Sequence, residues 1–173
     1  MTGSDDAPGW SLVTERLVIR PFAWADVDAF HAYRSDPEVA KWQGWSLPYS
    51  RADAESFVAA MVAAPQFRPG EWTQVGVAAR GAPEVLLGDF GVRIEAEEPT
   101  AEVGVTFSRA AQGQGYATEA LRALVAHLLV DRDCTRVVAI TLVENEPTQR
   151  LLARVGFGAV AQDGDELIFS CRV

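Results

Sequence analysis

A glycine-rich turn between a strand-like segment and an amphipathic helix is the feature that most constrains the fold of this chain. The turn reads Gln112-Gly113-Gln114-Gly115-Tyr116-Ala117. Glycines let the backbone bend and approach a ligand closely, and the first turn of the following helix has N–H groups without partners inside the helix. Such a helix start attracts anions. The sequence therefore predicts a strand, turn and helix unit that can bind phosphate.

The segments on both sides of the turn show clear periodicity. The helix predicted after it has one apolar face, made of Ala117, Ala120, Leu121, Leu124, Val125, Leu128 and Leu129. This spacing is typical of a helix packed on a sheet. Before the turn, residues 100–108 alternate apolar and polar, which predicts a strand. After the helix, the β-branched run at 136–143 predicts a buried strand parallel to the preceding one.

The remaining pattern adds strands and helices on both sides of this unit. Further strands are expected at 12–20, 71–79, 85–95, 157–162 and 166–173, and helices at 27–34, 50–64 and 147–155. The helix at 50–64 has a capping-box start at Ser50 and Asp53 and a stop at Pro65. The chain is thus expected to form an α+β (mixed α/β) fold with about seven strands and about four helices.

Length and composition indicate one globular domain. The chain has 173 residues, 49% hydrophobic and 23% charged, which is enough to build one substantial core. We expect a flexible segment at 1–11 and a single domain at 12–173. No apolar run reaches the roughly 18 residues of a membrane span, and the first residues do not resemble a secretory signal. The expected location is the cytoplasm, with no membrane partner.

The charged and sulfur-containing residues exclude several classes of site. A net charge of −9 disfavours nucleic-acid binding and mildly favours cationic partners. Cys134 and Cys171 are isolated in the sequence, so we interpret them as small apolar residues in a reducing compartment. The scarce histidines and cysteines form no recognisable ligand set, and no metal is expected.

Two nucleotide-binding motifs can be tested against the turn. A P-loop needs a lysine and a hydroxyl residue after the second glycine, but Tyr116 and Ala117 stand there. A dinucleotide fingerprint needs a third glycine where Thr118 stands. The turn alone is compatible with another phosphate ligand or with a plain connection between strand and helix.

Residues before and after the glycine turn add to the pattern. Glu102 lies ten residues before Gln112, and Glu144-Asn145-x-x-Thr148 and Val155-Gly156-Phe157 follow downstream. Together with Gln112, Gly115 and Ala117, they resemble the GNAT superfamily of acyl-CoA-dependent N-acetyltransferases. The opening segment at 14–21 resembles the branch that acetylates the N-termini of ribosomal proteins, the RimJ/RimL type. The resemblance covers residues 12–173.

The resemblance implies a fold and a set of coenzyme contacts. The sheet would be mixed and mostly antiparallel, with the strand at 100–108 splayed from its parallel neighbour. Backbone amides of Gln112, Gly113, Gln114, Gly115, Tyr116 and Ala117 would bind the coenzyme A pyrophosphate, with Tyr116 shaping the turn. Backbone groups of Val105 and Phe107 would pair with the pantetheine arm, which Asn145 would also contact. A turn asparagine before Pro147 is an equally ordinary structural residue.

Catalytic roles also follow from the resemblance. Glu102 matches the position of the general base in members of the superfamily, often acting through water; alternatively it is a solvated or ion-paired strand carboxylate. Thr148 stands where this branch usually has serine, and would protonate or hydrogen-bond the leaving sulfur. A threonine at the start of a helix can equally be a cap.

The expected activity is transfer of an acetyl group from acetyl-CoA, the co-substrate, to a primary amine by direct attack in a ternary complex. A protein N-terminal α-amine is the favoured acceptor, and a small-molecule amine is the other. The alternatives are a non-catalytic acyl-CoA-binding module and another enzyme that uses the turn for a different phosphate ligand. A homodimer is compatible with this branch. The aromatic loop at 41–49 either covers the edge of the core or forms a wall of the substrate pocket.

Overall fold

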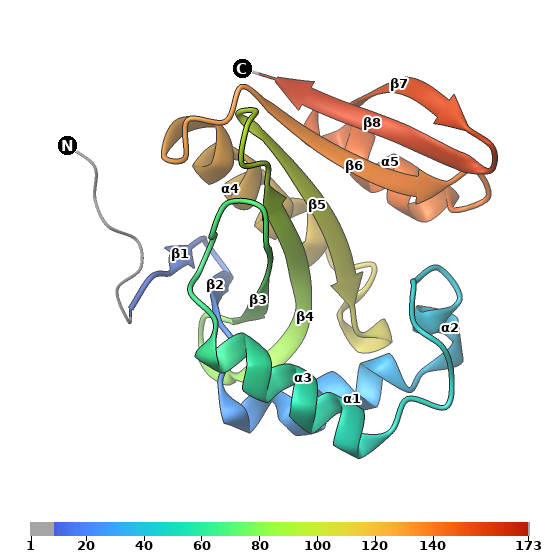
Figure 1. Cartoon of the computed structure of the whole chain (residues 1–173). Coiled ribbons are helices and arrows are strands. Elements are labelled where there is room, and N and C mark those ends of the chain that lie inside the picture. The colour runs from blue at the N-terminus through green and yellow to red at the C-terminus, as the bar shows by residue number, and fades with distance from the viewer. Residues whose placement is uncertain (1–8, 173) are drawn as a thin grey trace.

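The computed structural model describes residues 9–172, which form one eight-stranded sheet with helices packed against it (Figure 1). The strand order is β1-β2-β3-β4-β5-β6-β8-β7. The strands are β1 (Leu12–Val13), β2 (Leu17–Pro21), β3 (Trp72–Ala79), β4 (Ala82–Ile94), β5 (Thr100–Phe107), β6 (Arg136–Leu142), β7 (Gly158–Asp163) and β8 (Glu166–Arg172). The helices are α1 (Val27–Arg34), α2 (Pro37–Ala40), α3 (Arg51–Ala63), α4 (Tyr116–Val130) and α5 (Glu146–Val155), with short 3-10 turns at Trp24–Asp26 and Arg109–Ala111.

The pair β5 and β6 makes the sheet mixed, because the other registered pairs are antiparallel. Its parallel register covers only Thr100 with Arg136, Ala101 with Val137, and Glu102 with Val138. Beyond these residues the two strands diverge, as Figure 1 shows. The expected mixed, mostly antiparallel sheet with a splayed parallel pair is confirmed, and one edge of β5 is left without a partner strand.

The core of the described residues lies in two clusters. The apolar face of α4 packs in the larger cluster, where Leu121, Leu124 and Leu128 are fully buried. This confirms the face predicted from its periodicity. The smaller cluster joins α1 and α3 to β4, with Phe30 and Val58 at its centre. Burial of the α4 face fixes the position of the glycine turn at the start of that helix.

Two boundaries differ from the sequence prediction and raise the element counts. The strand expected at 12–20 is interrupted, because Thr14 bends the chain and its hydroxyl accepts a hydrogen bond from the Leu17 N–H at 3.1 Å. Asp36 and Pro37, which follow the helix expected at 27–34, begin the extra helix α2. The Asp36 side chain accepts from the Glu38 N–H at 2.9 Å, so it is an N-cap.

The expectation of a flexible segment at 1–11 falls mainly on residues 1–8, which lie outside the described residues. Within the described part, Trp10 is buried and packs edge-on against Phe67, with ring centroids 4.7 Å apart. Trp10, which falls within the segment expected to be flexible, is therefore packed in the core. Among residues 9–172, no helix is both long and apolar enough to traverse a bilayer.

Candidate active site

The glycine turn has backbone N–H groups without partners, because among residues 9–172 no hydrogen bond engages the N–H of Gly113, Gly115 or Tyr116. Gly113 and Gly115 both have left-handed backbone conformations, with φ of +74° and +79°. Gly115 is the N-cap of α4 and supplies no side chain to its first turn. Glycine is the residue that adopts such conformations without steric cost. The first amides of α4 therefore have the free N–H groups that an anion site needs.

Arg16, between β1 and β2, holds the glycine turn against this part of the chain. Its guanidinium donates to the Gln114 carbonyl at 3.0 Å, pairs with Glu119 at 2.6 Å and lies over the Tyr116 ring. Burial alone would raise the pKa of Glu119, but hydrogen bonds from Thr14 and Arg16 hold that pKa below its ordinary value. The carboxylate thus stays ionised and keeps the turn in place.

The unpaired edge of β5 carries the backbone groups predicted to meet the pantetheine arm. The Ser108 N–H bonds to Leu87 on β4, so the alternation of a strand directs the groups of Val105 and Phe107 away from β4. Side-chain amides already reach these two carbonyls. Gln43 donates to the Val105 carbonyl at 3.2 Å, and Gln112 to the Phe107 carbonyl at 3.0 Å. Both carbonyls are therefore accessible to hydrogen-bond donors from the splayed side.

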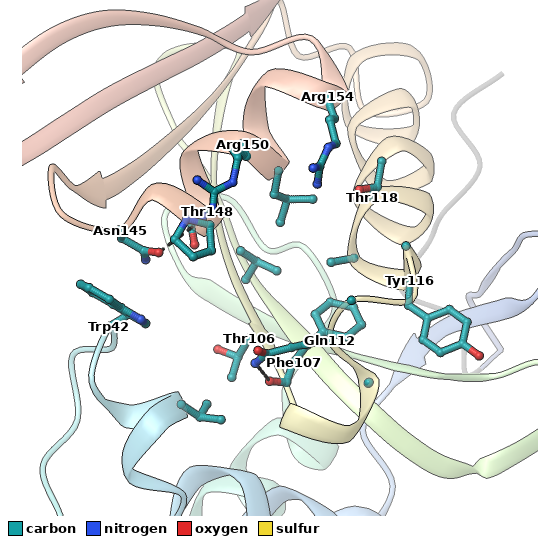
Figure 2. A pocket seen from close by; sticks show the side chains of 18 of the residues that line it. Trp42, Thr106, Phe107, Gln112, Tyr116, Thr118, Asn145, Thr148, Arg150 and Arg154 are labelled. Atoms are coloured by element: carbon teal, nitrogen blue, oxygen red, sulfur yellow. Dashed lines mark hydrogen bonds between the residues drawn. The ribbon is translucent and has the colours of Figure 1, made fainter.

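A cleft of about 510 Å³ joins the turn, the open edge of β5 and the start of α5. This size is ordinary for a small-molecule site. Figure 2 shows Thr118 and Arg154 toward its α4 side and Trp42 and Asn145 at the opposite side. A smaller cavity of about 80 Å³ lies in the splay between β5 and β6 and shares Thr148 and Asn145 with the cleft.

Asn145 and Thr148 lie together at the start of α5. The Asn145 carboxamide oxygen accepts from the Thr148 N–H at 3.3 Å, so Asn145 is the N-cap of the helix (Figure 2). This bond orients the Asn145 amide group, and its NH₂ is left for other partners. Among residues 9–172, no hydrogen bond engages the Thr148 hydroxyl. Asn145 thus has a structural role as a cap, whereas Thr148 does not cap the helix; both residues also line the cleft.

Like Gln114, Glu102 is a predicted site residue that does not line the cleft. It lies at the last registered pair of β5 and β6, and its carboxylate is 3.6 Å from the guanidinium of Arg93. Its neighbours Val103 and Gly104 line the small cavity, but Glu102 does not. Its side chain is about a quarter exposed, at 27%. Any contact between Glu102 and a group in the splay would have to pass through water or a side-chain movement.

A buried polar network beside the cleft was not foreseen from the sequence. Asp89 is fully buried on β4 and accepts hydrogen bonds from Tyr33 and Gln74, with the Arg34 guanidinium 3.8 Å away. Burial raises the pKa of Asp89 although Arg34 opposes the rise. Burial, followed by the charge of Asp89, raises the pKa of Tyr33. A charged residue in a strand normally faces solvent, so the local sequence around Asp89 does not predict that its side chain is buried.

Arg34 connects this network to the aromatic loop at 41–49. Its guanidinium lies 3.8 Å from the centre of the Trp45 ring, and its backbone carbonyl accepts from the Trp45 indole N–H at 2.9 Å. Trp42 and Gln43 from the same loop line the cleft. Trp45 therefore packs on Arg34 at the edge of the core, and Trp42 forms part of the wall of the cleft.

Two further arginines of the cleft were missed. Arg150 and Arg154 lie one turn apart on α5 and line the cleft, with Arg154 toward Thr118 of α4 (Figure 2). Their spacing of four residues places them on one face of a helix, which is the signal that would have found them. Within residues 9–172, no group of His, Cys, Asp and Glu side chains is arranged to hold a metal.

The chain matches the model of the acetyltransferase (GNAT) domain family over residues 16–158. It is 27% identical over 145 residues to the uncharacterized N-acetyltransferase YnaD of Bacillus subtilis (strain 168), covering 84% of this chain and 81% of the relative. The GNAT-family acetyltransferase of Bacillus anthracis shares the fold, with a TM-score of 0.79, 24% identity, and 94% and 98% of the chains covered. So does RimL, the ribosomal L7/L12 alpha-N-protein acetyltransferase, solved in complex with coenzyme A, with a TM-score of 0.80, 18% identity, and coverage of 94% and 97%. The chain belongs to the GNAT family of acetyltransferases.

Proposed function

We propose that this acetyltransferase moves an acetyl group from acetyl-CoA to a primary amine, preferentially a protein N-terminal α-amine, by direct attack in a ternary complex. The observation that carries the proposal is the continuous cleft from the glycine turn along the open edge of β5 to Thr148. A phosphate-binding helix start at one end and unpaired strand groups along the wall match a long ligand with a diphosphate and amide groups.

The residues present fit coenzyme A. The amides of Gly113, Gly115 and Tyr116 would hold the diphosphate, with Arg154 adding positive charge nearby. The N–H and C=O groups of Val105 and Phe107 would pair with the amides of the pantetheine arm. When bound, acetyl-CoA supplies an activated thioester. The presence of coenzyme A in the solved RimL structure, which has the same fold, supports this assignment.

The acceptor must present a neutral nitrogen. With a pKa near 10.4, only about 0.04% of a lysine-like amine is neutral at pH 7, whereas about 14% of an α-amine with a pKa near 7.8 is neutral. A lysine acceptor would need a strong base placed beside the nitrogen. No carboxylate lines the splay cavity, and Glu102 lies just outside it. This arrangement favours an α-amine, which needs less assistance.

Three groups of this chain would then carry the chemistry. Glu102 would accept the amine proton through an intervening water. The Val105 N–H, on the open edge of β5, would stabilise the negative charge that develops on the carbonyl oxygen. The Thr148 hydroxyl, with no hydrogen bond in the described structure, would donate to the departing sulfur, while the Asn145 NH₂ holds the pantetheine arm.

The Glu102→Gln variant is expected to lower turnover about sevenfold at pH 7, because the variant must use the roughly 14% of α-amine that is already neutral. The loss should be larger at pH 6, where only about 2% is neutral. Initial rates between pH 6 and 9 measure it. Glu95→Gln is the matched control, because Glu95 pairs with the same Arg93 at 2.7 Å but lies farther from the splay. Equal pH profiles for the two variants would remove Glu102 from the mechanism.

The proposed function itself is tested by release of free thiol from acetyl-CoA. The acceptor panel contains short peptides with free N-termini, polyamines and aminoglycosides. We expect the fastest release with peptides, and no release with the same peptides blocked by formylation. Release with polyamines or aminoglycosides alone would assign a small-molecule acceptor. Coenzyme A binding without release for any acceptor would contradict the proposal.

A further inference from the structure

We propose that Gln43 is a latch, a side-chain contact that holds the loop at 41–49 on the open edge of β5 until the arm of the donor displaces it. This inference rests on the proposed function, since it assumes that the pantetheine arm lies along that edge. It goes further because it makes the position of one wall of the cleft depend on the donor. The contact that carries it is the hydrogen bond from the Gln43 carboxamide to the Val105 carbonyl, at 3.2 Å.

The loop at 41–49 is anchored firmly to α1 but only lightly to the sheet. The Trp45 indole N–H donates to the Arg34 carbonyl at 2.9 Å, and the Arg34 guanidinium lies 3.8 Å from the centre of the Trp45 ring. Within residues 9–172, the bond from Gln43 is the one hydrogen bond between this loop and a strand of the sheet. Loss of that single bond therefore frees the loop from β5 and leaves its anchor on α1 intact.

The Gln43 carboxamide occupies the place that a ligand paired with β5 would take. Gln43 and Val105 both line the cleft and the small cavity beside it. A ligand that pairs with a strand edge places its own N–H groups on the edge carbonyls. At Val105 that position is taken by Gln43. The bond must therefore open before the arm can pair along the whole edge.

The other capped carbonyl of this edge shows why Gln43 is the informative residue. Gln112 donates to the Phe107 carbonyl at 3.0 Å, and the two residues are only five positions apart. Displacement of Gln112 would therefore leave the strand and the glycine turn where they are. Gln43 is 62 positions from Val105, so its displacement separates two distant segments of the chain.

Release of Gln43 changes one wall of the cleft. Trp42, its neighbour in the sequence, lines the cleft on the side opposite α4 (Figure 2). The Lys41 ammonium lies 4.5 Å from the centre of the Trp42 ring and belongs to the same segment. Trp45 keeps its contacts with Arg34 whether or not Gln43 is bound to β5. We therefore expect residues 41–43 to move when the donor binds and Trp45 to stay in place.

The expected change in affinity follows from the strength of one hydrogen bond. Such a bond favours the latched loop by about twofold to tenfold, and the apparent affinity of a ligand is reduced by the fraction of protein that is unlatched. Gln43→Ala should therefore bind coenzyme A about threefold to tenfold more tightly than wild type, as measured by calorimetry. The nucleotide half of coenzyme A, 3′-phospho-ADP, lacks the arm and should bind both proteins equally.

Tryptophan fluorescence follows the loop itself. Coenzyme A should change the emission of the wild-type protein, and 3′-phospho-ADP should not. Gln43→Ala without ligand should already show most of that change, because its loop is unlatched. Trp42→Phe should abolish the change and Trp45→Phe should retain it.

Gln149→Ala is the matched control, because the Gln149 carboxamide also donates to a backbone carbonyl, that of Val143 at 2.7 Å, but Gln149 does not line the cleft. It should not tighten the binding of coenzyme A. Equal or weaker binding of coenzyme A by Gln43→Ala would overturn the latch alone, and weaker binding would show that Gln43 holds the arm instead. Failure of the wild-type protein to bind coenzyme A would overturn the donor assignment itself.

Discussion

The Arg34→Met variant is expected to lose about 3 to 5 kcal/mol of unfolding free energy, because removal of one partner leaves a buried charge without compensation. Asp89, the carboxylate left behind, is fully buried. Arg34 also packs against the rings of Phe30, Trp45, Tyr49 and Phe57, and methionine retains much of that apolar contact. Urea denaturation followed by circular dichroism measures the loss.

The deficit of this variant should increase with pH. Arg34 lowers the pKa of Asp89, so removing it raises further a pKa that burial has already raised. A group with a raised folded-state pKa contributes stability that is complete below its unfolded pKa and is lost as the pH rises through the folded value. Protonated Asp89 therefore limits the damage at low pH. Denaturation at pH 5.5 and pH 8 should show the larger difference from wild type at pH 8.

Two further variants separate charge compensation from packing. Arg51→Met should leave the free energy of unfolding nearly unchanged, because Arg51 makes only exposed ion pairs with Asp28 and Glu55. The double variant Arg34→Met with Asp89→Asn removes both charges, and should recover at least half of the loss. A double variant no more stable than Arg34→Met would show that the aromatic contacts of Arg34, and not its charge, hold this region together.

The Gly113→Ala variant is expected to weaken coenzyme A binding at least tenfold. Gly113 has a φ of +74° and lines the cleft, and a Cβ there would meet no protein atom within 4 Å. The added methyl group would therefore occupy space beside the first amides of α4, where we place the diphosphate. It would also strain the turn that directs those amides. Calorimetric titration with coenzyme A measures the change.

Gly164→Ala separates the two causes. Gly164 also has a left-handed backbone, with a φ of +58°, and a Cβ there also meets nothing within 4 Å, but it lies in the turn between β7 and β8. Each substitution should cost about 1 to 3 kcal/mol of stability through backbone strain. Only Gly113→Ala should change the affinity. Equal affinities for both variants would place the diphosphate away from this turn.

The sequence predicted the elements whose signals are local. Periodicity located α4 and its buried face, and the Ser50 and Asp53 capping box marked the start of α3, where both reciprocal bonds are present. The break at Thr14 and the helix that begins at Pro37 were missed because each depends on one side-chain hydrogen bond within an otherwise regular pattern. Sequence periodicity does not indicate whether such a side-chain hydrogen bond forms, so it does not predict a break or a helix start that depends on one.

The part of the candidate site that could be predicted from the sequence is the part formed by the backbone alone. The glycine turn needed only its glycines, and the structure shows the positive φ angles that they allow. The pairing of Arg34 with Asp89 joins residues 55 positions apart in the sequence, and no spacing rule relates them. The distance of Glu102 from the cleft likewise depends on where β5 and β6 separate. Tertiary register, which one sequence does not reveal, decides both.

The bonds from Gln43 and Gln112 to the β5 carbonyls have a consequence for the protein without its donor. A strand edge with unpaired N–H and C=O groups is a template for pairing with another chain and a source of aggregation. Here two glutamine side chains, from a loop and from the glycine turn, cover the carbonyls of Val105 and Phe107. These side-chain hydrogen bonds disfavour pairing of the open edge of β5 with a strand of another molecule. A ligand that binds along β5 can replace them, because each is a single side-chain bond.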